Sequence, residues 1–569
     1  MSLDLHRRAG LAAAQAGDPA AAAAHFRQAL AGAPDDVPTR CNLAIALLSA
    51  GALQEAAETL GAGGDDPRLR RLAAYAYQQQ GRLAEAAAAY EAVLAAFPDD
   101  WESCNNLGNV RRAAGDLDGA VDAFRQAIRL RPDSVEMVFN LSNALGAAAR
   151  HDERVVTMRA AARIAPADAR VQTEYGVAAA EARALGEAET AYRAALAADP
   201  GFTAAFVELG LLLETQNRLD ELEALLAAAP AAGELDFLRA WLLRRQGRFA
   251  EALPLAEAAP ATIEPARRAQ LLGEIYDRLG DAPRAFAAFA EMNRAAEAAA
   301  PPADRSRYRR EVANATPTAW SPAEIEGAPP SPAFILGFPR SGTTLLDTLL
   351  LNLPELHVLE EIPVLDSVEE MARTATDSNA LRARYFEALA ALSPPAPGQR
   401  VIDKFPLHMA RAPLVHRLFP DARIVFVERH PCDSVLSCFM ANFQLNHAMR
   451  AFTDIEEAAR LYDAVMTAWT QARERLPLDV HAIRYERMIA DLEGEMRPLL
   501  DFLGIGWDPK VLDNKAAAQG RDYIRTASYA QVAEPIYARA VGRWERYRDQ
   551  LAPVLPILAP WAERMGYRL

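Results

Sequence analysis

The first half of the chain consists of helix-length stretches rich in alanine and leucine, interrupted at regular intervals. A small residue usually follows each interruption by five positions, and a proline ends several of the units. Such a turn joins two helices, the small residue lets them pack closely, and proline ends the second helix. The pattern therefore predicts an array of about nine helix pairs over residues 1–297. The turn residues recur every 30 to 34 positions, at Gly17, Gly51, Gly81, Gly115, Ala149, Arg183, Asn217, Gly247 and Gly280.

This period resembles the tetratricopeptide repeat (TPR). The resemblance implies a superhelix whose concave groove holds a polypeptide or positions a second domain. Polar residues stand nine positions before several turns, and an Asn amide can pair with a peptide backbone. A solvated polar face is the alternative. The candidates for groove contacts are Asn42, Asn106 and Asn140, followed in the same column by Glu174 and Glu208.

The pattern changes after residue 297. Residues 298–332 are rich in proline and predict a linker. Residues 333–569 alternate short apolar runs with helix-length segments, which predicts a central parallel sheet with ligands at the carboxyl ends of its strands. The expected fold is thus an all-α TPR superhelix followed by an α/β P-loop domain. The expected strands are Ala333–Phe338, His357–Leu359, Arg400–Asp403, Arg423–Val427 and Asp479–Tyr485.

The first expected strand runs into a loop with the sequence Gly337-Phe-Pro-Arg-Ser-Gly-Thr-Thr344. A loop of this kind at a helix N-terminus offers backbone N–H groups to an anion. The glycine spacing matches nucleotide-hydrolysing P-loops, but Thr343 stands where those have their lysine. Arg340, inside the loop, has a planar fork suited to an anionic group. The loop therefore predicts anion binding and argues against a kinase or nucleotidase.

Residues 331–550 resemble the sulfotransferases that use 3′-phosphoadenosine 5′-phosphosulfate (PAPS), and the loop resembles their 5′-phosphosulfate loop. Within that family the chain is similar to the tyrosylprotein sulfotransferases and to bacterial TPR-containing sulfotransferases. The resemblance implies that Arg429 and Ser437, eight residues apart, bind the 3′-phosphate of PAPS. Where the family often has a further Arg, this chain has Ala441. The resemblance also implies that the loop residues Pro339, Arg340, Ser341, Gly342, Thr343 and Thr344 bind the donor.

Sulfuryl transfer needs a base for the acceptor and cations for the leaving phosphate. The resemblance implies that the base is Glu361, which lies 21 residues after Arg340, with Glu360 as the fallback. It also implies that Lys404 contacts the bridging oxygen of the donor, and that Arg340 is a further catalytic residue. Lys404 is one of only three Lys among 61 basic residues, and its compact charge suits a single oxygen. Histidine is the alternative base, with His408 ahead of His416, His430 and His447.

Three residues nearer the C-terminus complete the expected site. Tyr485 matches a family tyrosine near the nucleotide, although a buried core position would explain it nearly as well. Ser528 and Arg543, 15 residues apart, resemble a family pair. The resemblance implies that Ser528 donates to the sulfate or the bridging oxygen, and that Arg543 binds the 3′-phosphate where the family has Lys.

Composition and charge argue against several other classes of protein. The net charge of −15 argues against a nucleic-acid-binding surface. No apolar run reaches the length of a membrane span, and Met1–Gln15 carries charges where a signal peptide would be apolar. The four Cys form no CxxC pair, so no metal site is expected. We therefore expect a cytoplasmic protein.

The leading hypothesis is a PAPS-dependent sulfotransferase whose TPR groove recruits the acceptor. A polypeptide tyrosine is one such acceptor, while glycan and small-molecule hydroxyls stay open. The alternative is a TPR scaffold with a catalytically inactive sulfotransferase-like domain, and Ala441 is the feature that favours it. The sequence identifies neither the acceptor nor the oligomeric state.

Overall fold

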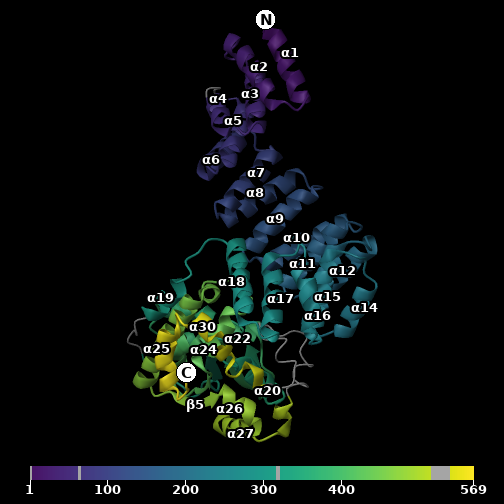
Figure 1. Ribbon diagram of the computed structural model, residues 1–569. Coiled ribbons are helices and arrows are strands. Elements are labelled where there is room, and N and C mark those ends of the chain that lie inside the picture. Colours follow the sequence, from purple (N-terminus) through teal and green to yellow (C-terminus); the bar gives the residue numbers. More distant parts are fainter. Residues whose placement is uncertain (1–2, 62–65, 315–320, 514–537) are drawn as a thin grey trace. The chain divides into compact units, whose positions relative to one another are not determined.

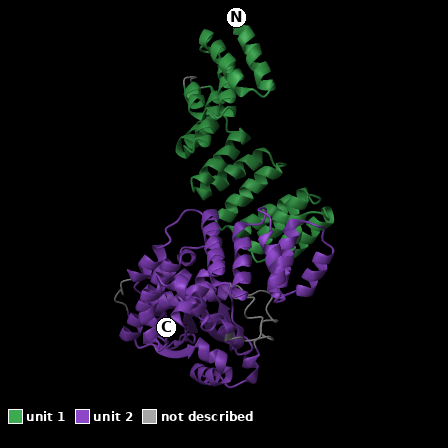
Figure 2. Ribbon diagram, viewed as in Figure 1, with its two compact units in different colours: residues 1–209 green, residues 210–569 purple. Residues whose placement is uncertain are grey.

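The computed structural model describes residues 3–61, 66–314, 321–513 and 538–569 (Figure 1). The chain forms two compact units, residues 1–209 and 210–569 (Figure 2). The sequence predicts different limits because it follows the end of the repeat pattern. These predicted limits are 1–297, 298–332 and 333–569, and they remain predictions. No described helix combines the length and the apolar character that a membrane span requires.

Antiparallel helix pairs joined by tight turns make up the repeat array (Figure 1). Every turn residue expected from the sequence has a positive φ, from 55° at Ala149 to 84° at Gly280. A left-handed residue at the end of a helix reverses the chain, so the predicted array of TPR helix pairs is confirmed. Its helices are α1 (Leu3–Gln15), α2 (Pro19–Gly32), α3 (Val37–Ser49), α4 (Leu53–Gly61), α5 (Pro67–Gln79), α6 (Leu83–Ala96), α7 (Trp101–Ala113), α8 (Leu117–Leu130), α9 (Val135–Ala147), α10 (His151–Ile164), α11 (Ala169–Glu181), α12 (Leu185–Ala198), α13 (Thr203–Thr215), α14 (Leu219–Ala227), α15 (Gly233–Arg245), α16 (Phe249–Glu257), α17 (Pro265–Arg278) and α18 (Ala282–Ala299).

The small residue that follows each turn is buried between the two helices of its pair. Ala22, Ala120 and Ala285 are all 0% exposed, as this close packing requires. Arg154 occupies the same position in the pair α9–α10 and is 6% exposed. Its guanidinium donates to the Ser142 hydroxyl at 3.0 Å and forms an ion pair with the Glu181 carboxylate. A buried cation with partners therefore replaces the alanine in this degenerate repeat.

Ala149 adopts a left-handed conformation that strains any residue with a Cβ atom. We expect Ala149→Gly to raise the free energy of unfolding of the repeats by about 0.5 kcal/mol, because relief of strain exceeds the added entropy of the unfolded chain. Urea unfolding, with hydrogen exchange of α9 and α10, measures the change. The matched control is Ala148→Gly, where φ is −82° and only the entropic cost applies. Equal effects of the two substitutions would contradict the prediction.

The α/β part contains a five-stranded parallel sheet in the order β2-β3-β1-β4-β5. All five strands expected from the sequence are present, and the predicted parallel sheet is confirmed. Because every strand points the same way, the residues that follow them meet at one edge of the sheet. The strands are β1 (Ala333–Gly337), β2 (Leu356–Glu360), β3 (Arg400–Lys404), β4 (Arg423–Glu428) and β5 (Asp479–Arg484).

Helices precede, connect and follow these strands. They are α19 (Arg307–Ala313), α20 (Thr343–Leu350), α21 (Asp366–Ala372), α22 (Ser378–Leu392), η1 (Pro406–Arg411), α23 (Ala412–Leu418), α24 (Pro431–Phe439), η2 (Met449–Thr453), α25 (Ile455–Arg475), α26 (Tyr485–Ala490), α27 (Leu492–Leu503), η3 (Pro509–Leu512), η4 (Ala538–Ala540), η5 (Arg543–Tyr547), α30 (Arg548–Leu551) and α31 (Leu555–Arg564).

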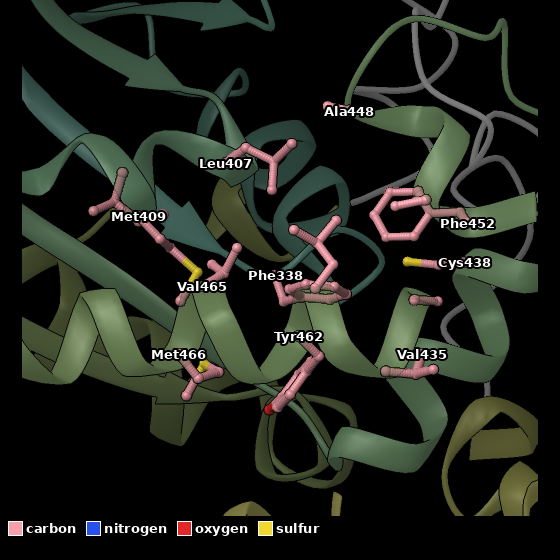
Figure 3. Close-up of a cluster of buried hydrophobic side chains, with 14 of the residues drawn as sticks. Phe338, Leu407, Met409, Val435, Cys438, Ala448, Phe452, Tyr462, Val465 and Met466 are labelled. Atoms are coloured by element: carbon pink, nitrogen blue, oxygen red, sulfur yellow. The ribbon is translucent and has the colours of Figure 1, made fainter. Parts of the chain in front are cut away.

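A buried apolar cluster anchors the loop that follows β1 (Figure 3). Phe338 is 3% exposed, and its ring packs edge-to-face against Tyr462 and Phe452, at centroid distances of 4.7 and 5.8 Å. The same cluster includes Phe289 and Met292 of α18. The last helix pair of the repeats therefore shares its core with the α/β sheet.

Candidate active site

Two glycines shape the loop between β1 and α20. A Cβ atom on Gly337 would lie 2.6 Å from the Ser341 hydroxyl and 2.8 Å from the carbonyl oxygen of Val427. Gly342 has φ +106°, and a Cβ atom there would lie 2.4 Å from the Tyr485 ring. Only glycine fits at both positions, so the loop closes tightly over the ends of β1 and β4. The first N–H groups of α20 lack carbonyl partners within the helix, which makes this end of the helix attractive to anions.

The structure brings together Arg340, Arg429 and Ser437, which are far apart in the sequence. The Nε of Arg340 donates to the Ser437 hydroxyl at 3.2 Å. The Nη1 of Arg429 donates to the carbonyl oxygen of Arg340 at 2.6 Å. Arg429 follows β4 and Ser437 lies on α24, so the spacing of eight residues spans a strand end and the helix after it. Arg340, Arg429 and Ser437 therefore lie together at the loop, while their binding of the donor stays a prediction.

Two buried polar atoms beside this loop have no hydrogen-bond partner within the part of the chain that the structure describes. They are the hydroxyl of Ser341, which is 1% exposed, and the Nε of Arg429, which is 7% exposed. Buried polar groups are rarely left unpaired, and such groups often mark a ligand site. One hydroxyl and one guanidinium N–H are donors suited to phosphate or sulfate oxygens, so the residues present fit an anionic donor.

A second cluster lies at the ends of β2 and β3. The Lys404 ammonium is 2.9 Å from Asp347 Oδ2 and 2.9 Å from Glu361 Oε1. The Glu361 backbone N–H donates to the Lys404 carbonyl at 2.9 Å, which joins the two strand ends. In the sheet β1 lies between β3 and β4, so its loop separates Lys404 from Arg429. Both clusters therefore lie at the same edge of the sheet.

The Lys404 side chain is fully buried, whereas Glu361 is 31% exposed. Burial by itself lowers the pKa of Lys404, but the carboxylates of Asp347, Glu361 and Glu360 outweigh it and raise the pKa above its ordinary value. Lys404 therefore stays protonated. Of Lys404, Asp347 and Glu361, Glu361 is the group whose side chain is partly exposed to an incoming substrate.

Arg340 and Glu361 also share an unusual backbone conformation. Their φ angles are +66° and +51°, and outside the repeat turns they are the only described residues other than glycine with positive φ. Such strain persists where surrounding contacts over-determine it, and it concentrates at functional sites. This backbone evidence is independent of the side-chain contacts and selects the same two residues.

Asp347 is a member of the site that sequence reasoning missed. It is fully buried on α20, and its second carboxylate oxygen accepts a hydrogen bond of 3.2 Å from the Thr348 hydroxyl. A signal was present, since Asp347 is the one charged residue of the helix Thr343–Leu350. A charge inside an apolar helix needs a buried partner, and the partner here is Lys404.

Tyr485 lies directly against the loop, at the start of α26. It is 9% exposed, contacts Gly342, and lies under the Arg429 guanidinium at 4.8 Å from the ring centroid. It also belongs to a second buried apolar cluster, separate from the cluster around Phe338. The structure thus supports its position in the core and its position beside the loop, while contact with a nucleotide stays a prediction.

Of the two C-terminal residues expected at the site, Ser528 and Arg543, the structure describes only one. Ser528 lies outside the described residues. Arg543 is described, and its guanidinium forms an ion pair of 2.7 Å with Asp277 of α17. Sequence reasoning did not foresee this partner, and the role of Arg543 at the 3′-phosphate stays a prediction.

The best of the alternative bases, His408, is fully buried. Its ring stacks on Phe405 at a centroid distance of 4.7 Å, and Nε2 lies 3.6 Å from Asp403 Oδ1. A base must reach the proton it removes, so the partly exposed Glu361 is the better candidate. Within the described ranges no three His, Cys, Asp or Glu side chains are grouped as a metal site would require.

Comparison with known proteins agrees with this geometry. A model of the sulfotransferase family matches residues 332–509, and tetratricopeptide repeat models match residues 13–66, 71–135 and 105–169. The sulfotransferase match begins just before β1 and includes both clusters of the site.

Individual relatives are similar at low identity. An uncharacterized protein of Aquifex aeolicus is 27% identical over 40% of this chain and 32% of its own length. Protein-tyrosine sulfotransferase A of Caenorhabditis elegans is 26% identical over 41% of this chain. The chain spans 66% of that enzyme and about a third of the Aquifex protein.

A solved structure, that of YrrB, "a TPR protein with an unusual peptide-binding site", is 21% identical. It covers 32% of this chain and 95% of its own, with a TM-score of 0.28. Residues 332–509 thus match the sulfotransferase family model, in a chain that also matches tetratricopeptide repeat models and is similar to the protein-tyrosine sulfotransferases.

Proposed function

We propose that the protein is a sulfotransferase that uses PAPS as its donor and an acceptor hydroxyl as its second substrate. The observation that carries the proposal is the meeting of two clusters at one sheet edge. Arg340, Arg429 and Ser437 form the first, and the Lys404–Glu361 pair belongs to the second. When bound, PAPS supplies a sulfuryl group that passes to the acceptor oxygen and leaves 3′-phosphoadenosine 5′-phosphate (PAP).

The first cluster supplies the donor-binding residues. The N–H groups at the start of α20, with Arg340 and Ser341, would hold the 5′-phosphosulfate. Arg429 and Ser437 would hold the 3′-phosphate, because a guanidinium and a hydroxyl together satisfy several phosphate oxygens. Pro339, Gly342, Thr343 and Thr344 complete the loop, while Tyr485, Ser528 and Arg543 stay proposed members of the site.

The second cluster supplies the proton transfer and the charge stabilisation. Glu361 is exposed enough to accept the proton of the acceptor hydroxyl. Lys404 keeps its proton beside this carboxylate, and its ammonium offsets negative charge that develops on a leaving oxygen. The buried carboxylate of Asp347 holds the ammonium in place. The intact pair favours an enzyme over the alternative of an inactive scaffold.

The proposed acceptor is a polypeptide bound by the repeats. TPR arrays present a groove suited to peptides, and the C. elegans relative is a protein-tyrosine sulfotransferase. Asn42, Asn106 and Asn140 stay candidates for groove contacts. Asn140 already donates to the Asn105 side chain at 2.9 Å, so a peptide would have to share or replace that bond. A screen with labelled PAPS on lysate, followed by mass spectrometry of the labelled species, identifies the acceptor.

Calorimetric titration of the full chain tests the proposed identity of the donor. We expect PAP to bind on the order of 100-fold more tightly than AMP, because AMP lacks the 3′-phosphate that Arg429 and Ser437 would contact. Magnesium ATP should bind weakly, since Thr343 replaces the P-loop lysine. Tight binding of magnesium ATP with no binding of PAP would reject the proposal in favour of a nucleotidase.

A further inference from the structure

A buried carboxylate on the last helix pair of the repeats contacts the C-terminal segment, which we define as residues 540–547. Asp277 lies on α17 and is 5% exposed. Its carboxylate pairs with Arg543 at 2.7 Å and with Arg546 at 3.1 Å. It also accepts a hydrogen bond of 2.7 Å from the Tyr547 hydroxyl. Three side chains of one short segment therefore converge on one carboxylate of a repeat helix.

These contacts fix the charge of Asp277. Burial opposes ionisation, but the guanidinium groups of Arg543 and Arg546 and the Tyr547 hydroxyl outweigh it, so the pKa of Asp277 lies below its ordinary value. The carboxylate is ionised at neutral pH, and both ion pairs are present there. A buried carboxylate with this many donors tethers the segment more strongly than a surface ion pair would.

The C-terminal segment also contacts the proposed phosphate site. Its carbonyl at Ala540 accepts a hydrogen bond of 2.6 Å from Nη2 of Arg429. Its N–H groups at Gly542 and Trp544 each donate to the Asp433 carboxylate of α24 at 2.8 Å. The segment therefore joins α17 to Arg429 and to the helix that carries Ser437.

The pair α17–α18 is itself fixed against α24. Asn293 of α18 donates to the carbonyl oxygen of Phe439 at 2.9 Å, and Phe286 stacks on the Phe439 ring at 4.7 Å. On α17, Gln270 accepts a hydrogen bond of 3.1 Å from Asn442. Asp277 thus holds the segment from a helix whose position relative to α24 is set by other contacts.

We infer that Asp277 is a positioning residue for the 3′-phosphate of the donor. The inference rests on the proposed function. Asp277 holds the C-terminal segment so that its Ala540 carbonyl keeps the Arg429 side chain in its orientation. A helix of the repeat array thereby contributes to donor selectivity, in addition to any part the repeats have in acceptor binding.

Calorimetric titration of the full-length protein with PAP and with AMP tests this inference. We expect Asp277→Asn to weaken PAP binding on the order of tenfold and to leave AMP binding unchanged, because only PAP carries a 3′-phosphate. The matched control is Asp281→Asn, at the start of the neighbouring helix, where the carboxylate pairs with exposed Arg284. Asn also caps helices well, so this control should leave both affinities as they are.

The ratio of the two affinities separates a positioning role from a structural one. An equal loss for PAP and AMP, an unchanged ratio, or tighter PAP binding by Asp277→Asn would overturn the inference. Failure of the wild-type protein to bind PAP would instead reject the proposed function. If Asp277→Asn does not fold, Tyr547→Phe removes a single hydrogen bond and must give the same selective loss, on the order of threefold.

Discussion

Replacing Glu361 with glutamine is expected to lower turnover by about a thousandfold while PAP affinity stays unchanged. The amide has the same shape and can still accept a hydrogen bond from Lys404, but it cannot remove a proton from the acceptor. The backbone bond from residue 361 to the Lys404 carbonyl also remains, so the strand ends stay joined. Initial rates of labelled sulfate transfer give the turnover, and calorimetry with PAP gives the affinity.

Glu360→Gln is the matched control for this substitution. Glu360 is the preceding residue and pairs in register with Lys404 across β2 and β3, so it places a second carboxylate next to the same strand ends. We expect its turnover to fall by less than about tenfold, because the proton is assigned to Glu361. A Glu361→Gln enzyme with full turnover, or a Glu360→Gln enzyme with the larger loss, would transfer the role of base to Glu360 or to another group. Loss of PAP binding in either variant would indicate a structural defect.

The repeat period predicts the turns well because the signal is local. A tight reversal between two helices needs a left-handed residue, and glycine provides it at Gly17 and Gly115. Even Ala149 and Arg183 have positive φ at the expected positions. The repeat spacing therefore identifies these two turns even though Ala and Arg are not typical turn residues. The five strands were predictable for a similar reason, since apolar runs of strand length are also local.

The contacts between distant segments were beyond the reach of the same reasoning. Nothing in the local sequence pairs Asp347 with Lys404 or Asp277 with Arg543. The first pair depends on the order of the strands in the sheet. The second depends on the packing of α17 against the α/β domain. The family spacing of Arg429 and Ser437 carries that long-range information implicitly. It does so only for residues that the family motif includes.

Removal of the Lys404 ammonium is expected to affect both turnover and stability. Lys404→Met should lower turnover by about 100- to 1,000-fold, as loss of a charge-stabilising donor does elsewhere. It should also lower the free energy of unfolding by about 3 kcal/mol, because it leaves the fully buried Asp347 carboxylate without its cation. The raised pKa of Lys404 determines how the stability contributed by this ion pair changes with pH. The ion pair contributes fully below the ordinary lysine pKa of about 10.4 and is lost only as the pH rises through the higher folded value.

The double variant Lys404→Met/Asp347→Asn separates the two effects. The amide introduced at position 347 would carry no charge, so the uncompensated buried carboxylate disappears and most of the lost stability should return. Turnover should stay as low as in Lys404→Met, because the cation beside the leaving oxygen is still missing. Urea unfolding and initial rates on the same preparations measure both quantities. Recovery of turnover together with stability would mean that Lys404 acts only by neutralising Asp347, and the assignment of Lys404 to charge stabilisation would then be wrong.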